Sequence, residues 1–272
     1  MTSAASHLNR FIEQHPKLLV ITGAGVSTQS GIPDYRDQQG NWKRPQPVQH
    51  QNFMREHHTR QRYWARSLAG WPTIRDAQPG IAHTSLVKLE QRGHIVQLVT
   101  QNVDRLHQRA GSRQVIDLHG RSDHVRCMHC HTRYPRERVH QHSASLNPDF
   151  VGLPATSAPD GDADLPTMDF SAFQVPDCPH CQGILKPDVV FFGDSVPRDR
   201  IERARDALQQ ADALLVVGSS LMVYSGFRFC KWAHDWQKPI CALTLGKTRA
   251  DHLLSLKLDA EIGQTLQQAV SD

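Results

Sequence analysis

The sequence predicts an α/β protein built on a doubly wound parallel sheet, with a smaller inserted module and a helical insertion. Three observations lead to this fold class. Short runs of Val, Ile and Leu recur along the chain, each run ends in small or polar residues, and stretches with helical spacing lie between the runs. Continuous apolar runs are typical of parallel strands covered on both faces. Strands that alternate with helices in this way favour a doubly wound sheet.

Six apolar runs are expected to form the strands of the sheet. In chain order they are Leu18–Ile21, Ile95–Thr100, Val115–Leu118, Val189–Phe192, Ala213–Val217 and Ile240–Leu245. The clearest helices are expected at Arg198–Gln210, Ser225–Gln237 and Glu261–Val270. These elements assign residues 1–45, 79–120 and 188–272 to one Rossmann-like domain.

Two segments interrupt the alternation of strands and helices. Residues 46–78 are expected to form a helical insertion with two or three short amphipathic helices. Residues 121–187 contain four of the six cysteines and are expected to form a small module of their own. Within it, residues 143–169 are rich in Pro, Asp, Ala and Ser and lack periodicity, which predicts a long exposed loop.

Composition and charge exclude several classes of protein. The chain has 272 residues, of which 39% are hydrophobic, so it can bury a large core. The longest apolar run is Ala213–Val217, too short to span a bilayer. Lys and Arg number 31 against 27 Asp and Glu, without a block of like charges, which argues against a nucleic-acid partner. The first ten residues lack a signal-peptide core and the first expected strand begins at Leu18, so we expect a cytoplasmic protein.

The four cysteines of the small module have the spacing of metal ligands. They form two Cys-x-x-Cys pairs, Cys127 with Cys130 and Cys178 with Cys181. Four thiolates complete a tetrahedral Zn²⁺ site and leave no position for water, so the metal is expected to stabilise the fold and not to catalyse. Such a site contributes on the order of 10–16 kcal/mol. The alternatives are redox or free thiols, or a ligand from the neighbouring His129, His131 or His180.

A glycine-rich turn follows the first expected strand. Gly23-Ala24-Gly25 precedes an expected helix, the setting in which a helix N-terminus binds a pyrophosphate. Thr28 stands where the third glycine of a dinucleotide-binding motif would fall. By itself the turn is equally consistent with a strand–helix connection that binds nothing.

Six segments in order point to one family. They are Gly23–Ser27, Ser30–Arg36, Thr100–His107, Leu118–Gly120, Lys186–Asp194 and Gly218–Leu221, with the two cysteine pairs between the fourth and fifth. Together they resemble the sirtuin family of NAD-dependent protein deacylases, over nearly the whole chain. The stretch Arg60–Pro72 and the long segment between the cysteine pairs resemble the class II, sirtuin-4-like branch.

The resemblance implies a reaction and its catalytic residues. Sirtuins are transferases: the acyl oxygen of a modified lysine attacks the ribose C1′ of NAD, which releases nicotinamide. A histidine then acts as general base on a ribose hydroxyl, and the products are free lysine and O-acyl-ADP-ribose. His119 matches this histidine, while Asn102 and Asp104 match the nicotinamide pocket.

The remaining NAD residues follow from the same resemblance. The full set is Gly23, Ala24, Gly25, Ser27, Asp34, Tyr35, Arg36, Gln101, Asn102, Asp104, Gly218, Ser219, Ser220, Thr244, Leu245, Gly246 and Ile262. Asp34 and Arg36 match a loop that closes over NAD. Thr244 stands where the family usually has Asn, and Asp194 stands where it often has Glu.

The acylated peptide is expected to lie extended between Val190–Asp194 and Leu221–Ser225, bound mainly through its backbone. The substrate-binding residues on the first of these segments are Val190, Phe191, Phe192 and Gly193. Phe191 and Phe192 are expected to wall the lysine tunnel, although one of them could be plain core.

A further pair suggests an acyl preference. Tyr63 and Arg66 are three positions apart, hence on one face of a helix, as in sirtuins that hold an acidic acyl group. Trp64 and Trp71 also fit an aromatic wall for a larger acyl chain. Alternatively, this face is a solvated row of arginines with the aromatic residues packed beneath it.

Two other functions use the same motifs. One is mono-ADP-ribosyl transfer to a protein, and the other is a non-catalytic zinc-stabilised module that binds NAD or ADP-ribose. A general base at His119 argues against the second. The sequence leaves the acyl group, the protein targets and the oligomeric state open.

Overall fold

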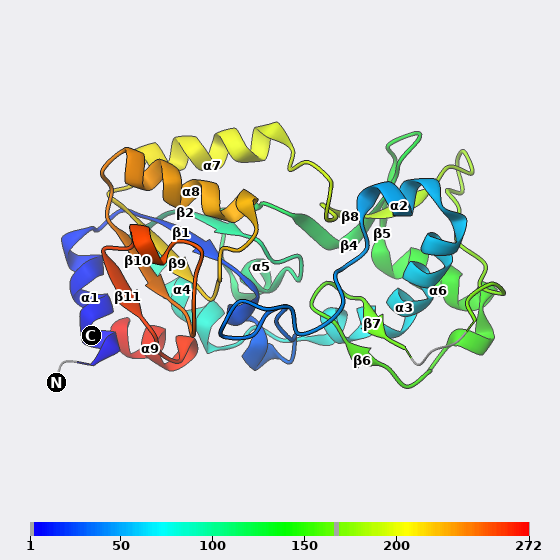
Figure 1. The fold of residues 1–272 in the computed structure, drawn as a ribbon, viewed down its shortest axis with the longest axis horizontal. Coiled ribbons are helices and arrows are strands. Elements are labelled where there is room, and N and C mark those ends of the chain that lie inside the picture. The colour runs from blue at the N-terminus through cyan, green and yellow to red at the C-terminus, as the bar shows by residue number, and fades with distance from the viewer. Residues whose placement is uncertain (1–2, 166–168, 272) are drawn as a thin grey trace.

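The computed structural model describes residues 3–165 and 169–271. Figure 1 shows a layered unit, in which helices cover both faces of a sheet, beside a smaller unit of helices and short strands. Residues 166–168 of the predicted exposed loop lie outside the described residues, as do the ends of the chain at 1–2 and 272. Across the described ranges, we find no helix that combines the length and apolar character needed to cross a membrane.

The main sheet has six strands in the order β11-β10-β9-β1-β2-β3, and every neighbouring pair is parallel. Their bounds are β1 Leu18–Thr22, β2 Ile95–Thr100, β3 Val115–Asp117, β9 Ala213–Val217, β10 Ile240–Leu243 and β11 Leu256–Leu258. Five of the six predicted strands are therefore confirmed in the predicted sheet.

The prediction for Val189–Phe192 is wrong. The strand there is β8 (Leu185–Val189), which ends where the predicted strand begins and pairs antiparallel with β4 (Gly120–Cys127). With β5 (Arg133–Pro135) these two strands form a separate sheet in the order β5-β4-β8. The sixth place in the main sheet belongs to β11, whose three residues are too few to show a pattern in the sequence.

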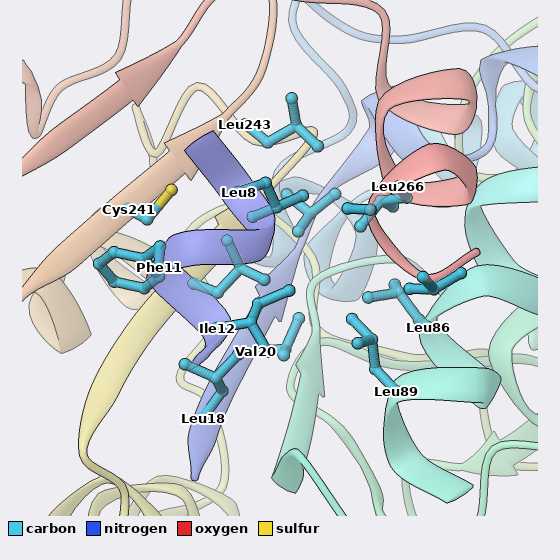
Figure 2. Close-up of a cluster of buried hydrophobic side chains, with 14 of the residues drawn as sticks. Leu8, Phe11, Ile12, Leu18, Val20, Leu86, Leu89, Cys241, Leu243 and Leu266 are labelled. Atoms are coloured by element: carbon cyan, nitrogen blue, oxygen red, sulfur yellow. The ribbon is translucent and has the colours of Figure 1, made fainter. Parts of the chain in front are cut away.

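Strand β1 is buried on both faces, as its continuous apolar run predicts. Leu18 and Val20 belong to the core formed with α1 (Ala4–Gln14), α4 (Ile81–Gln91) and α9 (Ile262–Ala269). Figure 2 shows part of this core. Leu19 and Ile21 face the opposite core, beneath α7 (Arg198–Gln210) and α8 (Tyr224–Asp235). Burying one such side chain contributes about 1.5–3 kcal/mol. The two helix layers therefore stabilise the sheet and fix the positions of its strand ends.

The smaller unit combines the helical insertion and the cysteine-containing module. The insertion forms α2 (His50–Arg55) and α3 (His57–Asp76), so a single 20-residue helix replaces most of the short helices predicted. The module adds α6 (Arg136–Leu146), the 3₁₀ turn η3 (Pro148–Phe150) and the hairpin β6 (Thr156–Ser157) with β7 (Ala163–Asp164). One core joins them and includes Phe53, Trp64, Val125, Phe173 and Leu185.

The long segment 143–169 is not an exposed loop throughout. Its first residues complete α6, Phe150 is buried in the core of the smaller unit, and Ala163 is fully buried. The hairpin β6–β7 lies against α3. A segment rich in proline and aspartate shows no periodic pattern of apolar residues. Its buried residues could not be predicted in this way, because they are buried by contacts with another segment.

Candidate active site

A cavity of about 930 Å³ opens at the carboxyl ends of β1, β2 and β9 and continues to the smaller unit. It brings together nearly all of the predicted NAD residues, namely Gly23, Ala24, Gly25, Ser27, Asp34, Tyr35, Arg36, Gln101, Asn102, Asp104, Gly218, Ser219, Ser220, Thr244, Leu245 and Ile262. His119 lines the same cavity, together with Tyr63, Val190, Phe191, Phe192 and Gly193. Two predicted residues, Gly246 and Arg66, do not line it.

The glycine-rich turn packs directly against the turn that follows β9. The Gly25 amide donates to the Gly218 carbonyl at 2.9 Å, and a Cβ on Gly25 would lie 2.9 Å from the Gly218 Cα. Gly218 has a positive φ of 62°. The close approach of the two backbones requires glycine at both Gly25 and Gly218. Together the two turns form the floor of the cavity.

The predicted helix after Gly25 is absent. The chain forms two three-residue 3₁₀ turns instead, η1 (Ala24–Val26) and η2 (Thr28–Ser30), so the pyrophosphate setting of a long helix N-terminus does not apply here. Ser219 and Ser220, in the turn after β9, line the same part of the cavity and offer polar groups to a ligand there.

The predicted nicotinamide residues form a connected hydrogen-bond network. The Asn102 side-chain amide donates to the Gly23 carbonyl at 3.0 Å and to Ser27 Oγ at 3.1 Å. Ser27 Oγ donates to Asp104 Oδ2 at 2.7 Å, and Asp104 Oδ1 accepts from the Leu106 amide at 2.9 Å. Asp104 is only 6% exposed. The network fixes an amide oxygen and a carboxylate at the cavity wall, as recognition of a carboxamide requires.

His119 follows β3 and is held at both ring nitrogens. Nδ1 lies 3.0 Å from the Gln101 carbonyl oxygen, and Nε2 lies 2.7 Å from Ser225 Oγ. Burial lowers the pKa of His119 from its ordinary 6.5 to about 4, and the charges of Arg200 and Arg228 act in the same direction. The ring is therefore neutral at pH 7, the form in which it can accept a proton.

Gln101 and Ser219 connect the ends of β2 and β9. Gln101 Nε2 donates to Ser219 Oγ at 2.8 Å and to the Thr22 carbonyl at 3.2 Å. Ser219 Oγ also accepts from the Leu221 amide at 3.2 Å. This hydroxyl thus lies at the cavity wall and also caps the following turn, so a contact to a cofactor and a capping role are compatible.

Thr244 and Gly246 differ in what they contact. Thr244 is buried at the end of β10 and lines the cavity, whereas Gly246 lies beyond it. A Cβ on Gly246 would lie 2.5 Å from the Gln38 Cα, and the Lys247 amide donates to the Gln38 carbonyl at 2.8 Å. Gly246 therefore leaves room for the backbone at Gln38 and does not line the cavity.

The loop that follows η2 is held by local polar contacts. Arg36 Nη1 donates to the Gly40 carbonyl at 2.7 Å, and its guanidinium lies 3.9 Å from the centre of the Trp42 ring. Asp34 pairs with Lys43. Burial lowers the pKa of Arg36. An arginine and a carboxylate thus border the cavity on a segment without regular structure, as the predicted loop requires.

Aromatic side chains form the opposite wall. Phe191 packs on Phe53 at 5.3 Å and on Tyr63 at 5.2 Å between ring centres, and Phe192 packs on Trp42 at 5.5 Å. Both phenylalanines line the cavity, although Phe191 is also part of the core of the smaller unit. The two roles considered for these residues therefore coexist.

The backbone on this side is partly used by the protein itself. The Val190 amide donates to the His119 carbonyl at 2.8 Å, and the Phe192 carbonyl accepts from the His50 amide at 2.8 Å. Gly193 has a φ of 78° and lies against the side chains of Gln49 and Gln51. An extended peptide at 190–194 can pair only with the backbone groups that these contacts leave free.

The acidic-acyl prediction for Arg66 is not supported by its contacts. Its guanidinium lies 2.9 Å from Asp162 Oδ2 and 3.1 Å from Asp164 Oδ1, and its Nε donates to the Ala163 carbonyl at 2.6 Å. Arg66 is thus occupied by carboxylates of the chain, while Tyr63 does line the cavity. The partners of Arg66 lie about a hundred positions further along the chain, so the spacing of residues along α3 could not predict them.

The four cysteines meet as the spacing predicts. All four sulfur atoms lie within 4.8 Å of one another. Cys127 Sγ is 3.5 Å from Cys181 Sγ, and Cys130 Sγ is 3.7 Å from Cys178 Sγ. Tetrahedral zinc with bonds of about 2.3 Å separates its sulfurs by about 3.8 Å, so the cluster fits structural Zn²⁺. The neighbouring histidines are not part of it.

Sequence patterns do not reveal the part that four residues play here. Ser225, Asp160 and Asp162 line the cavity, and Lys186 lies behind its aromatic wall. The sequence places Ser225 only in a peptide-contact range, Lys186 only in a motif, and the two aspartates only in a loop. Lys186 is 5% exposed in its side chain and lies 3.5 Å from Asp194 and 4.4 Å from the centre of the Phe191 ring. The Lys-Pro-Asp segment was the available signal for Lys186, while nothing local distinguished the two aspartates.

Comparison with known proteins agrees with this geometry. A model described as the Sir2 family matches residues 23–225. A relative from Xanthomonas axonopodis pv. citri (strain 306), named NAD-dependent protein deacetylase, is 59% identical over 98% of this chain and 92% of its own. The NAD-dependent protein deacylase Sirt4 of Drosophila melanogaster is 44% identical over 95% of this chain and 84% of its own.

Solved structures have the same fold as this chain. The chain is similar to a structure described as Sir2–p53 peptide–NAD⁺, with a TM-score of 0.79 and 27% identity over 100% of this chain and 98% of the other. It is equally similar to Sir2 bound to acetylated peptide, with a TM-score of 0.79 and 28% identity over the same shares. The family match covers most of the chain and the relatives span it almost entirely, so this protein belongs to the Sir2 family of sirtuins.

Proposed function

We propose that this protein is an NAD-dependent protein-lysine deacetylase. It transfers the acyl group of a modified lysine to ADP-ribose and releases nicotinamide and free lysine. One observation carries the proposal: His119, Asn102 and Asp104 line a single cavity floored by the glycine turns at Gly25 and Gly218. The names and bound ligands of the relatives support it.

The side chains divide the work of the reaction. Asn102 and Asp104 bind the carboxamide of nicotinamide and orient the ribose C1′ toward the substrate acyl oxygen. When that oxygen attacks, the bond to nicotinamide breaks. His119 Nε2 then takes a proton from a ribose hydroxyl, which attacks the acyl carbon. The carbon–nitrogen bond to lysine breaks, the lysine amine leaves with a proton, and one water supplies the oxygen that completes O-acyl-ADP-ribose. The neutral His119 ring supports this role, because a protonated ring could not act as a base.

The other predicted NAD residues keep their proposed roles, with the exception of Gly246. Gln101, Ser219 and Thr244 offer polar groups to the ribose and phosphates, and Arg36 brings positive charge to the phosphates. The division into residues 1–45, 79–120 and 188–272 for NAD binding, 46–78 for the helical insertion and 121–187 for the zinc module is likewise proposed. Zinc, held by the four cysteines, supplies structural stability to that module and no chemistry.

We assign the chain to the class II, sirtuin-4-like branch as a proposal. Its support is the identity of 44% with the fly Sirt4 protein and the long segment between the cysteine pairs. A cytoplasmic location and the absence of a nucleic-acid partner stay predictions from the sequence.

Mass spectrometry of the products tests the function. Purified protein is incubated with NAD and an acetyl-lysine peptide. Release of nicotinamide together with O-acetyl-ADP-ribose and free lysine is the expected result. ADP-ribose attached to protein would favour the mono-ADP-ribosyltransferase instead, and NAD left intact would favour a module that only binds.

A further inference from the structure

We infer that Asp160 and Asp162 set the acyl specificity of this protein. They favour an acyl group whose far end donates hydrogen bonds or carries positive charge, over one that ends in a carboxylate. The inference rests on the proposed deacylase function, because it concerns the acyl end of the same cavity. It also reverses the preference that Tyr63 and Arg66 suggested in the sequence.

The segment that carries the two aspartates is seated on α3 by its backbone. Arg66 Nε donates to the Ala163 carbonyl at 2.6 Å, and Ser67 Oγ donates to the Gly161 carbonyl at 3.2 Å. Gly70 leaves room for the Asp162 backbone, which a Cβ on Gly70 would meet. Three successive positions of the segment are thus held, which fixes where its side chains start.

Both aspartates line the cavity on its aromatic side. Tyr35 and Tyr63 line the same region, and the Tyr63 ring packs 5.2 Å from the ring of Phe191. The two carboxyl groups lie close enough to both tyrosines to raise their pKa values, in addition to the effect of burial. The aspartates therefore belong to the wall that Phe191 shares, which is the wall proposed for the acylated lysine and not the glycine floor.

Charge on this segment is unbalanced toward the carboxylates. Asp164 pairs with Arg44 at 3.1 Å and with Arg66 at 3.1 Å, and Asp162 pairs with Arg66 at 2.9 Å. Within residues 3–165 and 169–271, Asp160 forms no ion pair, although the charges of Arg66 and Arg44 act on it from further away; its Oδ1 accepts the Asp162 backbone amide at 3.3 Å. Three carboxyl groups thus share two guanidinium groups, and Asp160 is the one left for the cavity.

Burial and mutual repulsion make this pair costly to keep ionised. Burial raises the pKa of Asp160, and burial together with the charge of Asp160 raises the pKa of Asp162 to about 7. A third carboxylate, brought by the substrate, would add to the repulsion. A hydroxyl, amide or ammonium group would instead satisfy the carboxyl oxygens, and a hydrogen bond to a charged group is stronger than a neutral one.

A panel of peptides that differ only in the acyl group tests the inference. The panel carries acetyl, hexanoyl, ω-hydroxypentanoyl, ω-aminopentanoyl and glutaryl lysine at saturating NAD. Hexanoyl and the two ω-substituted pentanoyl groups have the same number of heavy atoms, so only the terminal atom changes. The expected order of kcat/KM among the long chains places ω-aminopentanoyl and ω-hydroxypentanoyl above glutaryl, by about tenfold or more.

Two matched variants test whether the acyl preference arises from an aspartate that lines the cavity. Asp160→Asn keeps the shape and removes the charge, so it should lower turnover of the ω-aminopentanoyl peptide about tenfold and raise that of glutaryl, with a smaller change for acetyl, whose short chain carries no terminal polar group. Asp164→Asn is the control, because Asp164 belongs to the same segment but does not line the cavity. It should leave the order of the panel as in the unsubstituted protein.

The outcomes separate this inference from the function on which it rests. If the protein cleaves acetyl-lysine but prefers glutaryl, or if Asp160→Asn changes every peptide equally, the specificity inference is overturned and the deacylase stands. If no peptide is cleaved, the acetyl peptide included, both fail together. A reversal of the preference confined to Asp160→Asn supports it.

Discussion

His119 Nε2 lies 2.7 Å from Ser225 Oγ, across 106 positions of sequence. The other ring nitrogen faces the Gln101 carbonyl oxygen at 3.0 Å. A carbonyl can only accept a hydrogen bond, so Nδ1 carries the proton of the neutral ring and Nε2 keeps its lone pair. That lone pair accepts from Ser225 and is the atom available for proton transfer in the cavity.

Replacing this ring should separate the two halves of the reaction. We expect His119→Ala to fold normally and to lose deacylation by about 10²–10⁴, the usual contribution of general acid–base catalysis. Exchange of labelled nicotinamide into NAD should survive in part, because the first attack uses the substrate oxygen. His124→Ala on β4, outside the cavity, is the control. Near-normal peptide turnover by His119→Ala would exclude His119 as the base.

The pH dependence should reflect the buried state of His119. Its pKa of about 4 lies below the ordinary 6.5, so the base stays neutral as pH falls from 7 to 5. Activity that depends on the neutral ring is therefore lost only as pH falls through the lowered value. We expect kcat/KM to fall on the acid side only well below pH 6.5. Circular dichroism at each pH checks that the protein remains folded. A fall at pH 6.5 in folded protein contradicts the buried ring.

The same pKa predicts a direction for stability. The folded state binds no proton at His119 between pH 6.5 and about 4, whereas the unfolded state does. Stability from this group is present above pH 6.5 and declines as pH falls through that window. Urea unfolding at pH 7 and pH 5 should show a smaller decline for His119→Ala than for the unsubstituted protein, and an equal decline would contradict it.

Zinc should be stoichiometric and structural. We expect one Zn²⁺ per chain by elemental analysis, and Cys127→Ser should lose it, because the cluster has no spare sulfur. The smaller unit should then unfold and activity disappear, although no residue of the NAD site has changed. Cys230→Ala, which alters a buried cysteine outside the cluster, should keep its zinc. Wild-type protein purified without zinc would refute the assignment.

The contact between the two glycine turns should tolerate no side chain. Gly25→Ala places a Cβ against the backbone of Gly218, which cannot move away as a side chain could. We expect a loss of about 1–3 kcal/mol of stability, as for overpacked cores, and weaker NAD binding by calorimetry. Gly263→Ala is the control, since the atoms nearest to its Cβ belong to the flexible Gln29 side chain and not to the backbone. Equal effects of the two substitutions would show that the backbone contact does not matter.

Arg66 should prove to be a residue of stability. Arg66→Met leaves Asp162 and Asp164 without their shared cation, and we expect a loss of about 1–3 kcal/mol, less than for a fully buried pair because the guanidinium is partly exposed. Turnover of glutaryl-lysine should not fall selectively. Arg62→Met, on an exposed position of α3, should change neither quantity in chemical denaturation or in the assay. A tenfold loss confined to acidic acyl peptides would restore Arg66 to the acyl pocket.

Local sequence patterns predicted the parts of this protein whose interactions are local. Continuous apolar runs identified β1 and β9, because a strand covered on both faces is apolar along most of its length. The cysteine pairs predicted the zinc cluster, since each pair carries half of a tetrahedron within four residues. The NAD residues were implied by the resemblance to the sirtuin family, and several of them follow strand ends, which a parallel sheet brings to one edge.

Tertiary structure alone decided the rest. The apolar run Val189–Phe192 has the composition of a strand of the main sheet, but the strand ends at Val189, and the pairing of β8 with β4 places it in the smaller sheet. Arg66 looks like an anion site until Asp162 and Asp164 lie against it, and His119 meets Ser225 only because β3 and α8 share an end of the fold. Hydrogen bonds and ion pairs act over a few ångströms in space, so their partners follow from the folded path of the chain and not from distance along it.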